Sequence, residues 1–159
     1  MDKLGLRKMS FPFDWVRTNN LDNITELIQN KFQFFFDDLQ IIDNDGDFPI
    51  INDFWDYTQE INSKKIKNKY FVFLHDNNHI QEFIIKYTRR IDRFYEILSD
   101  DKIKKIFVRL SKKDETDEIN KLEKVLQIFS NNHKIINYIY DKKIKSWQKD
   151  DLNWQQIFT

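Results

Sequence analysis

The chain contains no cysteine and no alanine among its 159 residues, and only two glycines and two prolines. Without cysteine it can form no disulfide, hold no metal through thiolates and supply no thiol nucleophile. It contains no glycine-rich phosphate loop and no serine in a nucleophile-elbow pattern. Several common enzyme classes are therefore excluded for this stretch of sequence.

The chain also has no excess of positive or negative charge, because 26 basic residues balance 26 acidic residues. A net charge of zero gives no electrostatic reason to expect nucleic acid or an anionic membrane as a partner. The chain has no long apolar run and no signal-peptide pattern, so we expect a soluble, cytoplasmic protein without a membrane partner.

Aromatic residues are abundant instead, at 16% of the chain with fifteen phenylalanines. This content is typical of a folded protein rather than a disordered one. The length suits one domain with one core, so we expect residues 1–159 to form a single domain.

The second half of the sequence alternates short apolar runs with amphipathic segments. "KYFVFLH" (69–75), "KKIFVRL" (104–110) and "KIINYIY" (134–140) are typical of buried strands. Apolar residues at helical spacing predict helices over 80–98 and 116–130. This order predicts an α/β fold: a parallel-rich sheet, with strands near 70–75, 104–110 and 134–140, and helices packed on it.

The first half and the C-terminus have weaker patterns. Helical spacing from Leu21 to Phe35 predicts a helix that Asn19 or Asn20 can cap. Residues 37–54 are expected to form an acidic loop with a short strand at 39–42, and "WQKDDLNWQQIF" is expected to form a C-terminal helix.

Two segments could be taken for metal sites. "DNDGD" (43–47) has clustered carboxylates, but its spacing around Gly46 does not match a calcium loop. His75 and His79 are four residues apart, but His75 ends a predicted strand and no third ligand is near in sequence. We therefore predict no metal and no cofactor.

Polar residues at the predicted strand ends are the candidate site. His75 and Asp76 end one strand and Arg109 lies near the end of the next, where open parallel sheets bind ligands. Arg89 shares a helix face with Arg93 and could clamp a phosphate or a carboxylate. The alternatives are a histidine bonded to a loop carbonyl and arginines that are solvated or paired with neighbouring acids.

The segment "FPFDWVRTNN" (11–20) places Asp14 among aromatic residues. If those aromatics are buried, the carboxylate needs a polar partner. His75, Arg89 and Arg109 are the candidates, and a structural ion pair is as compatible with the pattern as a catalytic role.

Three segments together resemble a known family: "LGLRKMSFPFDWV" (4–16), "FLHD" (73–76) and "KYTRRIDRFYEIL…KKIFVRL" (86–110). The family, found in bacteria and large DNA viruses, is of unknown function and has been proposed to be a papain-like cysteine peptidase. The resemblance implies an α+β papain-like fold as the alternative. It also implies a Cys nucleophile in a Ser-Leu-Gly-x-x-Cys segment ahead of the first matching segment, with His75 as its base and Asp14 close to the same site.

Because the sequence contains no cysteine, three functional hypotheses are considered, none of which uses a thiol of this chain. By the resemblance, the chain is expected to be truncated before the family's first strand and its Cys, or to keep the scaffold without the chemistry; whether it is an enzyme is left open. The alternatives are a non-catalytic interaction or structural domain, using Phe34–Phe36 and the Trp-bearing C-terminus, and an anion-binding non-thiol enzyme. A missing first strand would expose an apolar edge near 70–75, so self-association or a protein partner is possible.

Overall fold

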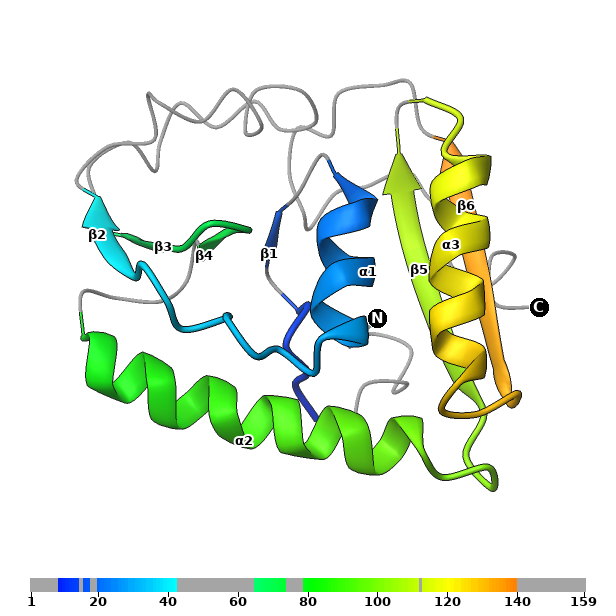
Figure 1. Ribbon diagram of the computed structural model, residues 1–159, viewed down its shortest axis with the longest axis horizontal. Helices are drawn as coiled ribbons and strands as arrows, with labels where there is room; N and C mark the ends of the chain where they lie inside the picture. The colour runs from blue at the N-terminus through cyan, green and yellow to red at the C-terminus, as the bar shows by residue number, and fades with distance from the viewer. Residues whose placement is uncertain are drawn as a thin grey trace.

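The computed structural model describes residues 9–14, 16–17, 20–42, 65–73, 79–111 and 113–139, in which helices and strands are mixed (Figure 1). The sequence "DNDGD" and the predicted C-terminal helix lie outside the described residues. The elements in chain order are β1 (Val16–Arg17), α1 (Leu21–Gln29), β2 (Gln40–Ile42), β3 (Lys65–Lys67), β4 (Val72–Phe73), α2 (Ile80–Leu98), β5 (Lys105–Ser111), α3 (Thr116–Gln127) and β6 (His133–Ile139).

The described strands form two small sheets. One is antiparallel with the order β1-β4-β3-β2, and the other is the parallel pair β5–β6. The parallel pair runs in continuous register from Lys105 opposite His133 to Ser111 opposite Ile139. Helix α3 connects these two strands and lies alongside them (Figure 1). The predicted strands at 104–110 and 134–140, and their parallel pairing, are confirmed.

The prediction for the strand near 70–75 is wrong in its pairing. That strand is present as β4, but it pairs antiparallel with β1 and β3 instead of joining β5. The cause is a tight turn at Asn68, whose side-chain oxygen accepts from the backbone N–H groups of Tyr70 and Phe71, both at 2.9 Å. Such a short connection can join only antiparallel neighbours. The expected single parallel sheet is therefore replaced, among the described residues, by two sheets.

The helix predictions hold at most of their boundaries. Helix α2 has the predicted bounds, and α3 ends three residues earlier than predicted. Helix α1 begins after Asn20, whose side chain accepts from the N–H of Asp22 at 2.9 Å. It does not continue to residue 35, because Lys31 and Phe32 adopt positive φ angles of 53° and 57°. The chain turns there, yet it still directs Phe32 and Phe35 into the core.

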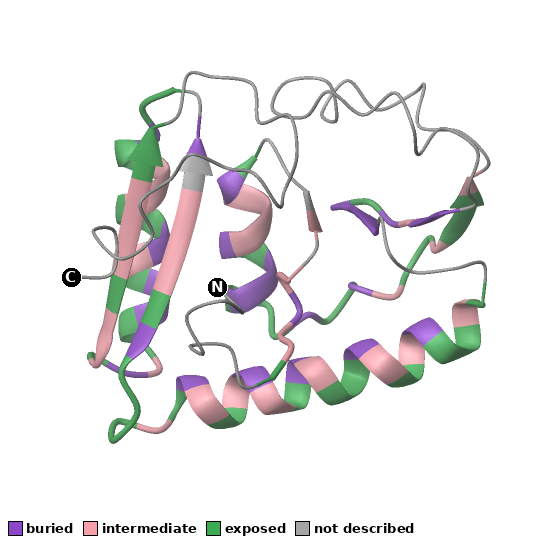
Figure 2. Cartoon of the chain, turned by 180° about the vertical axis from the view of Figure 1, so that it is seen from behind, coloured by how far each residue is buried: buried purple, intermediate pink, exposed green. Residues whose placement is uncertain are grey.

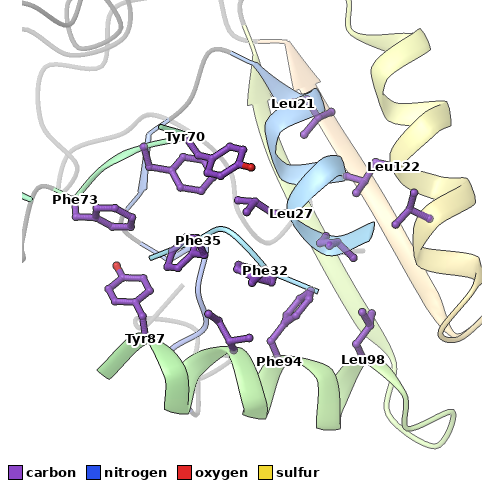
Figure 3. Packing of buried hydrophobic residues seen from close by; sticks show 14 of the residues in the cluster. Leu21, Leu27, Phe32, Phe35, Tyr70, Phe73, Tyr87, Phe94, Leu98 and Leu122 are labelled. Carbon is purple, nitrogen blue, oxygen red and sulfur yellow. The ribbon is translucent and has the colours of Figure 1, made fainter. Parts of the chain in front are cut away.

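One aromatic core joins the two sheets and the helices (Figure 3). Phe35 is at its centre with none of its surface exposed, and Phe83 and Tyr87 of α2 stack with ring centroids 4.3 Å apart. Aromatic pairs of this kind add to the free energy gained from burying their area. The buried side of α2 faces this core, and its outer side is exposed (Figure 2). The buried residues of α2 are Phe83, Tyr87, Ile91, Phe94 and Leu98.

The structure also bears on the aromatic surface predicted at residues 34–36. Of the three residues Phe34–Phe36, only Phe34 is exposed, so they do not form the continuous aromatic surface expected for an interaction domain.

Tyr95 of α2 donates a hydrogen bond to the carbonyl of Ile28 at 2.8 Å, and burial raises the pKa of its phenol to about 12. None of the helices in the described ranges is both long enough and apolar enough to cross a membrane.

Candidate functional site

The aromatic segment that carries Asp14 forms a closed turn. The carboxylate Oδ2 of Asp14 accepts from the backbone N–H of Phe11 at 2.9 Å, and the N–H of Asp14 donates to the carbonyl of Phe11 at 3.2 Å. Pro12, between them, is fully buried and restricts the backbone. Asp14 is thus half-buried and held in one place by its own turn.

Contacts with the core and with α2 fix the turn in the molecule. The ring of Phe13 lies 5.5 Å from the rings of both Phe32 and Phe94, measured between centroids. Arg93 of α2 donates from Nη1 to the carbonyl of Ser10 at 3.1 Å. Phe13 and Arg93 therefore anchor this turn to the core and to α2.

Tyr87 connects the turn electrostatically to α2. Burial raises the pKa of its phenol above the ordinary value; the charge and hydrogen bond of Arg90 oppose this increase, and the Asp14 carboxylate adds to it. The Arg90 guanidinium lies over the Tyr87 ring, with Cζ 4.8 Å from the centroid. The phenol therefore stays neutral at physiological pH and can act as a hydrogen-bond donor.

The strand pair β1–β4 lies directly after this turn. Val16 is opposite Phe73 and Arg17 is opposite Val72. Trp15, His75 and Asp76 lie outside the described residues, so the structure describes Asp14, Arg89 and Arg109 of the five predicted site residues.

Arg109, predicted as a ligand residue at a strand end, takes part in a buried ion pair. Its Nε and Nη2 atoms donate to the two carboxylate oxygens of Glu115, at 2.7 and 2.9 Å. The Glu115 side chain is 3% exposed and that of Arg109 is 18% exposed. This bidentate pair joins β5 to the start of α3, and it agrees with the alternative that the arginines are paired with acids rather than free to bind a ligand.

Arg89 lies on the exposed side of α2, beside an open groove of about 570 Å³. Lys86, one turn earlier, has its pKa lowered by burial and then by the positive charges of Arg90 and Arg89. The groove is lined by Ile84, Ile85, Thr88, Arg89, Asp92, Arg93 and Glu96.

Lys86, Tyr87 and Arg90 are not among the predicted site residues, although the spacing contains a signal for the two basic ones. Basic residues at 86, 89, 90 and 93 follow the i, i+3, i+4, i+7 spacing of one helix flank. Across the described ranges, no group of three or more His, Asp or Glu side chains is placed to hold a metal ion.

Comparisons with known proteins agree with the segments singled out in the sequence. The model of a family described as "Putative papain-like cysteine peptidase" matches residues 1–149. An uncharacterized protein of Acanthamoeba polyphaga mimivirus is 29% identical over 201 aligned positions, which cover 99% of this chain and 90% of that protein. No solved structure matches the chain.

Proposed function

The chain belongs to the family described as putative papain-like cysteine peptidases, and we propose that it retains the family's scaffold but is catalytically incomplete over these 159 residues. The observation that carries the proposal is the absence of cysteine from the whole sequence. A cysteine peptidase needs a thiolate that attacks the scissile carbonyl, and this sequence supplies no thiol.

The family resemblance implies that His75 is a base and that Asp14 lies close to the same site. In the β1–β4 pair, each step back along β1 corresponds to one step forward along β4. If this register continued two steps beyond the pair Val16–Phe73, Asp14 would face His75. We therefore propose that Asp14 and His75 are neighbours, with Asp14 held by its turn as the acceptor that would orient the imidazole.

The absence of activity is the first test. We expect the purified chain to cleave neither casein nor a quenched fluorescent peptide library between pH 5 and 8, measured by fluorescence against buffer alone. Papain serves as the positive control. Turnover that disappears in a His75→Ala variant would show that the chain has a working non-thiol site, and would contradict the proposal. Turnover that persists in the variant would be assigned to a contaminant.

The second test concerns only whether positions 14 and 75 are neighbours. Because the sequence contains no cysteine, two cysteines introduced into one chain can form a disulfide within it only with each other. Asp14→Cys combined with His75→Cys is expected to form an intramolecular disulfide in air, because cross-strand neighbours lie within the distance of about 7 Å that a disulfide spans. The product is measured by mass spectrometry of the monomer before and after reduction.

A matched pair controls for chance collisions. Lys69 is exposed and lies in the turn before β4, on the far side of that strand from position 75. Asp14→Cys with Lys69→Cys should therefore remain reduced under the same conditions. If the control pair forms the bond as readily as the 14–75 pair, or if the 14–75 pair stays reduced, the proposed neighbourhood is wrong.

A further inference from the structure

We propose that residues 144–158 of this chain dock as a helix on the face of the β5–β6 pair that is turned away from α3. The occupant of that face is thus the chain's own C-terminal segment and not a second protein. This inference does not depend on the loss of thiol chemistry, because it rests on the described strands and on the residue spacing that follows β6.

The face of the strand pair towards α3 is already occupied. Side chains at alternate positions of a strand point to the same face of the sheet. Arg109 of β5 bonds to Glu115 at the start of α3. His133 of β6 lies 3.0 Å from the Glu123 carboxylate of α3, measured from Nε2 to Oε1, and Phe107 packs against the core. These positions mark the face that α3 and the core fill.

The opposite face is apolar, and no described helix or strand covers it. It carries the intervening positions Ile106, Val108, Ile136 and Tyr138. Ile106 and Tyr138 are among the exposed large hydrophobic residues. Figure 2 shows the two strands from this side, in front of α3, with no described element drawn over them. An apolar sheet face of this kind is typical of a surface that another segment or molecule covers.

The sequence after β6 has an apolar stripe that matches this face. Four large apolar residues share one side of a helix with 3.6 residues per turn: Ile144, Trp147, Trp154 and Phe158. Asp151 falls on the same stripe, and Lys134 lies on the open sheet face, opposite Ile106 in the register. The charges of the segment and of the face are therefore complementary.

The lengths also agree. A helix over residues 144–158 spans about 22 Å, and a strand of seven residues, such as β5 or β6, spans about 23 Å. Residues 140–143 are sufficient for the connection, because strand-to-helix loops are commonly about 2–6 residues long. Since α3 fills one face, a helix that returns along the sheet from the end of β6 has the open face available.

Limited trypsin digestion of the whole chain tests the docking, because Lys145 and Lys149 lie within the segment. We expect both sites to be protected, and Ile106→Asp to raise their rate of cleavage about tenfold or more, because a charge in an apolar contact releases the segment. Ile128→Asp is the matched control at the exposed end of α3, and it should change the rate less than about twofold. Mass spectrometry identifies the sites of cleavage.

Spin labels test where the segment lies. The sequence contains no cysteine, so a nitroxide can be attached to Lys104→Cys just before β5, or to Glu82→Cys as the control. Both positions are exposed, and Glu82 lies at the end of α2 that is far from β6 (Figure 1). The label at position 104 should remove most of the intensity of the Trp154 indole NMR signal, whereas the label at position 82 should leave it nearly unchanged.

Each other outcome rejects the docking. Cleavage of the unchanged chain at Lys145 and Lys149 as fast as in urea, equal effects of the two aspartate variants, or no loss of the Trp154 signal would overturn the proposal. A signal loss that also occurs between labelled and unlabelled chains in a mixture would assign the face to a second copy instead. Circular dichroism checks folding, and if Ile106→Asp does not fold, the two spin labels decide the question.

Discussion

Phe35→Ala is expected to lower the free energy of unfolding by about 3–5 kcal/mol, because it removes a large side chain from the centre of the core and leaves a cavity. No surface of Phe35 is exposed, and its position is shown in Figure 3. Its ring centroid lies within 6.5 Å of those of Phe32, Phe36, Phe71, Phe73, Phe83 and Tyr87. Urea unfolding followed by far-UV circular dichroism measures the loss.

The neighbouring residue provides the control for this first prediction. Phe34 has the same side chain one position earlier, but it is 49% exposed. Phe34→Ala should therefore cost less than about 1 kcal/mol, since an exposed ring loses little burial when it is truncated. Equal losses for the two variants would mean that the aromatic core is not centred on Phe35.

Glu115→Gln is expected to lower the free energy of unfolding by about 3 kcal/mol, because it removes the charged partner of a largely buried arginine. The Arg109 guanidinium makes two hydrogen bonds to the Glu115 carboxylate, and almost no surface of Glu115 reaches solvent. The neutral amide keeps the size of the side chain but removes the negative charge of Glu115 from beside the guanidinium. Urea unfolding at neutral pH measures the effect.

Two variants separate the ion pair from other effects at the same place. Asp117→Asn removes an exposed negative charge from the first turn of the same helix, so it tests the helix dipole alone and should cost less than about 1 kcal/mol. Arg109→Leu combined with Glu115→Leu should recover much of the stability lost in Glu115→Gln, because no unpaired charge remains buried. A loss in Asp117→Asn as large as that in Glu115→Gln would contradict the assignment to the ion pair.

These two interactions differ in how far they could be predicted. The burial of Phe35 follows from its place in an apolar series, so the sequence alone indicated it, although the helix expected to carry it ends earlier. The partner of Arg109 is six residues away across a strand end and a helix start, and no local periodicity connects the two. The sequence marked Arg109 as a candidate ligand residue, whereas the structure shows it joining β5 to α3.

The candidate site likewise combines features that the sequence indicated with features that only the structure shows. The sequence identified Asp14 and its aromatic neighbours, and it identified Arg89 on a helix face. The cap that Asp14 forms on its own turn and the stacking of Arg90 on Tyr87 depend on exact side-chain geometry. Residue spacing does not encode that geometry, so Lys86, Tyr87 and Arg90 entered the site only with the structure.

By itself, the sequence determined the properties that depend on residue type or on local periodicity. The absence of cysteine settles which nucleophile this chain lacks, and the 3.6-residue period of α2 was sufficient to place both ends of that helix. The tertiary structure decided which strands are neighbours. An apolar run buried on both faces, such as Val72–Phe73, is equally suited to parallel and antiparallel partners, and the turn at Asn68 is what makes β4 antiparallel. Strand pairing joins residues far apart in the chain, and its free energy depends on turns and packing that a local pattern does not contain.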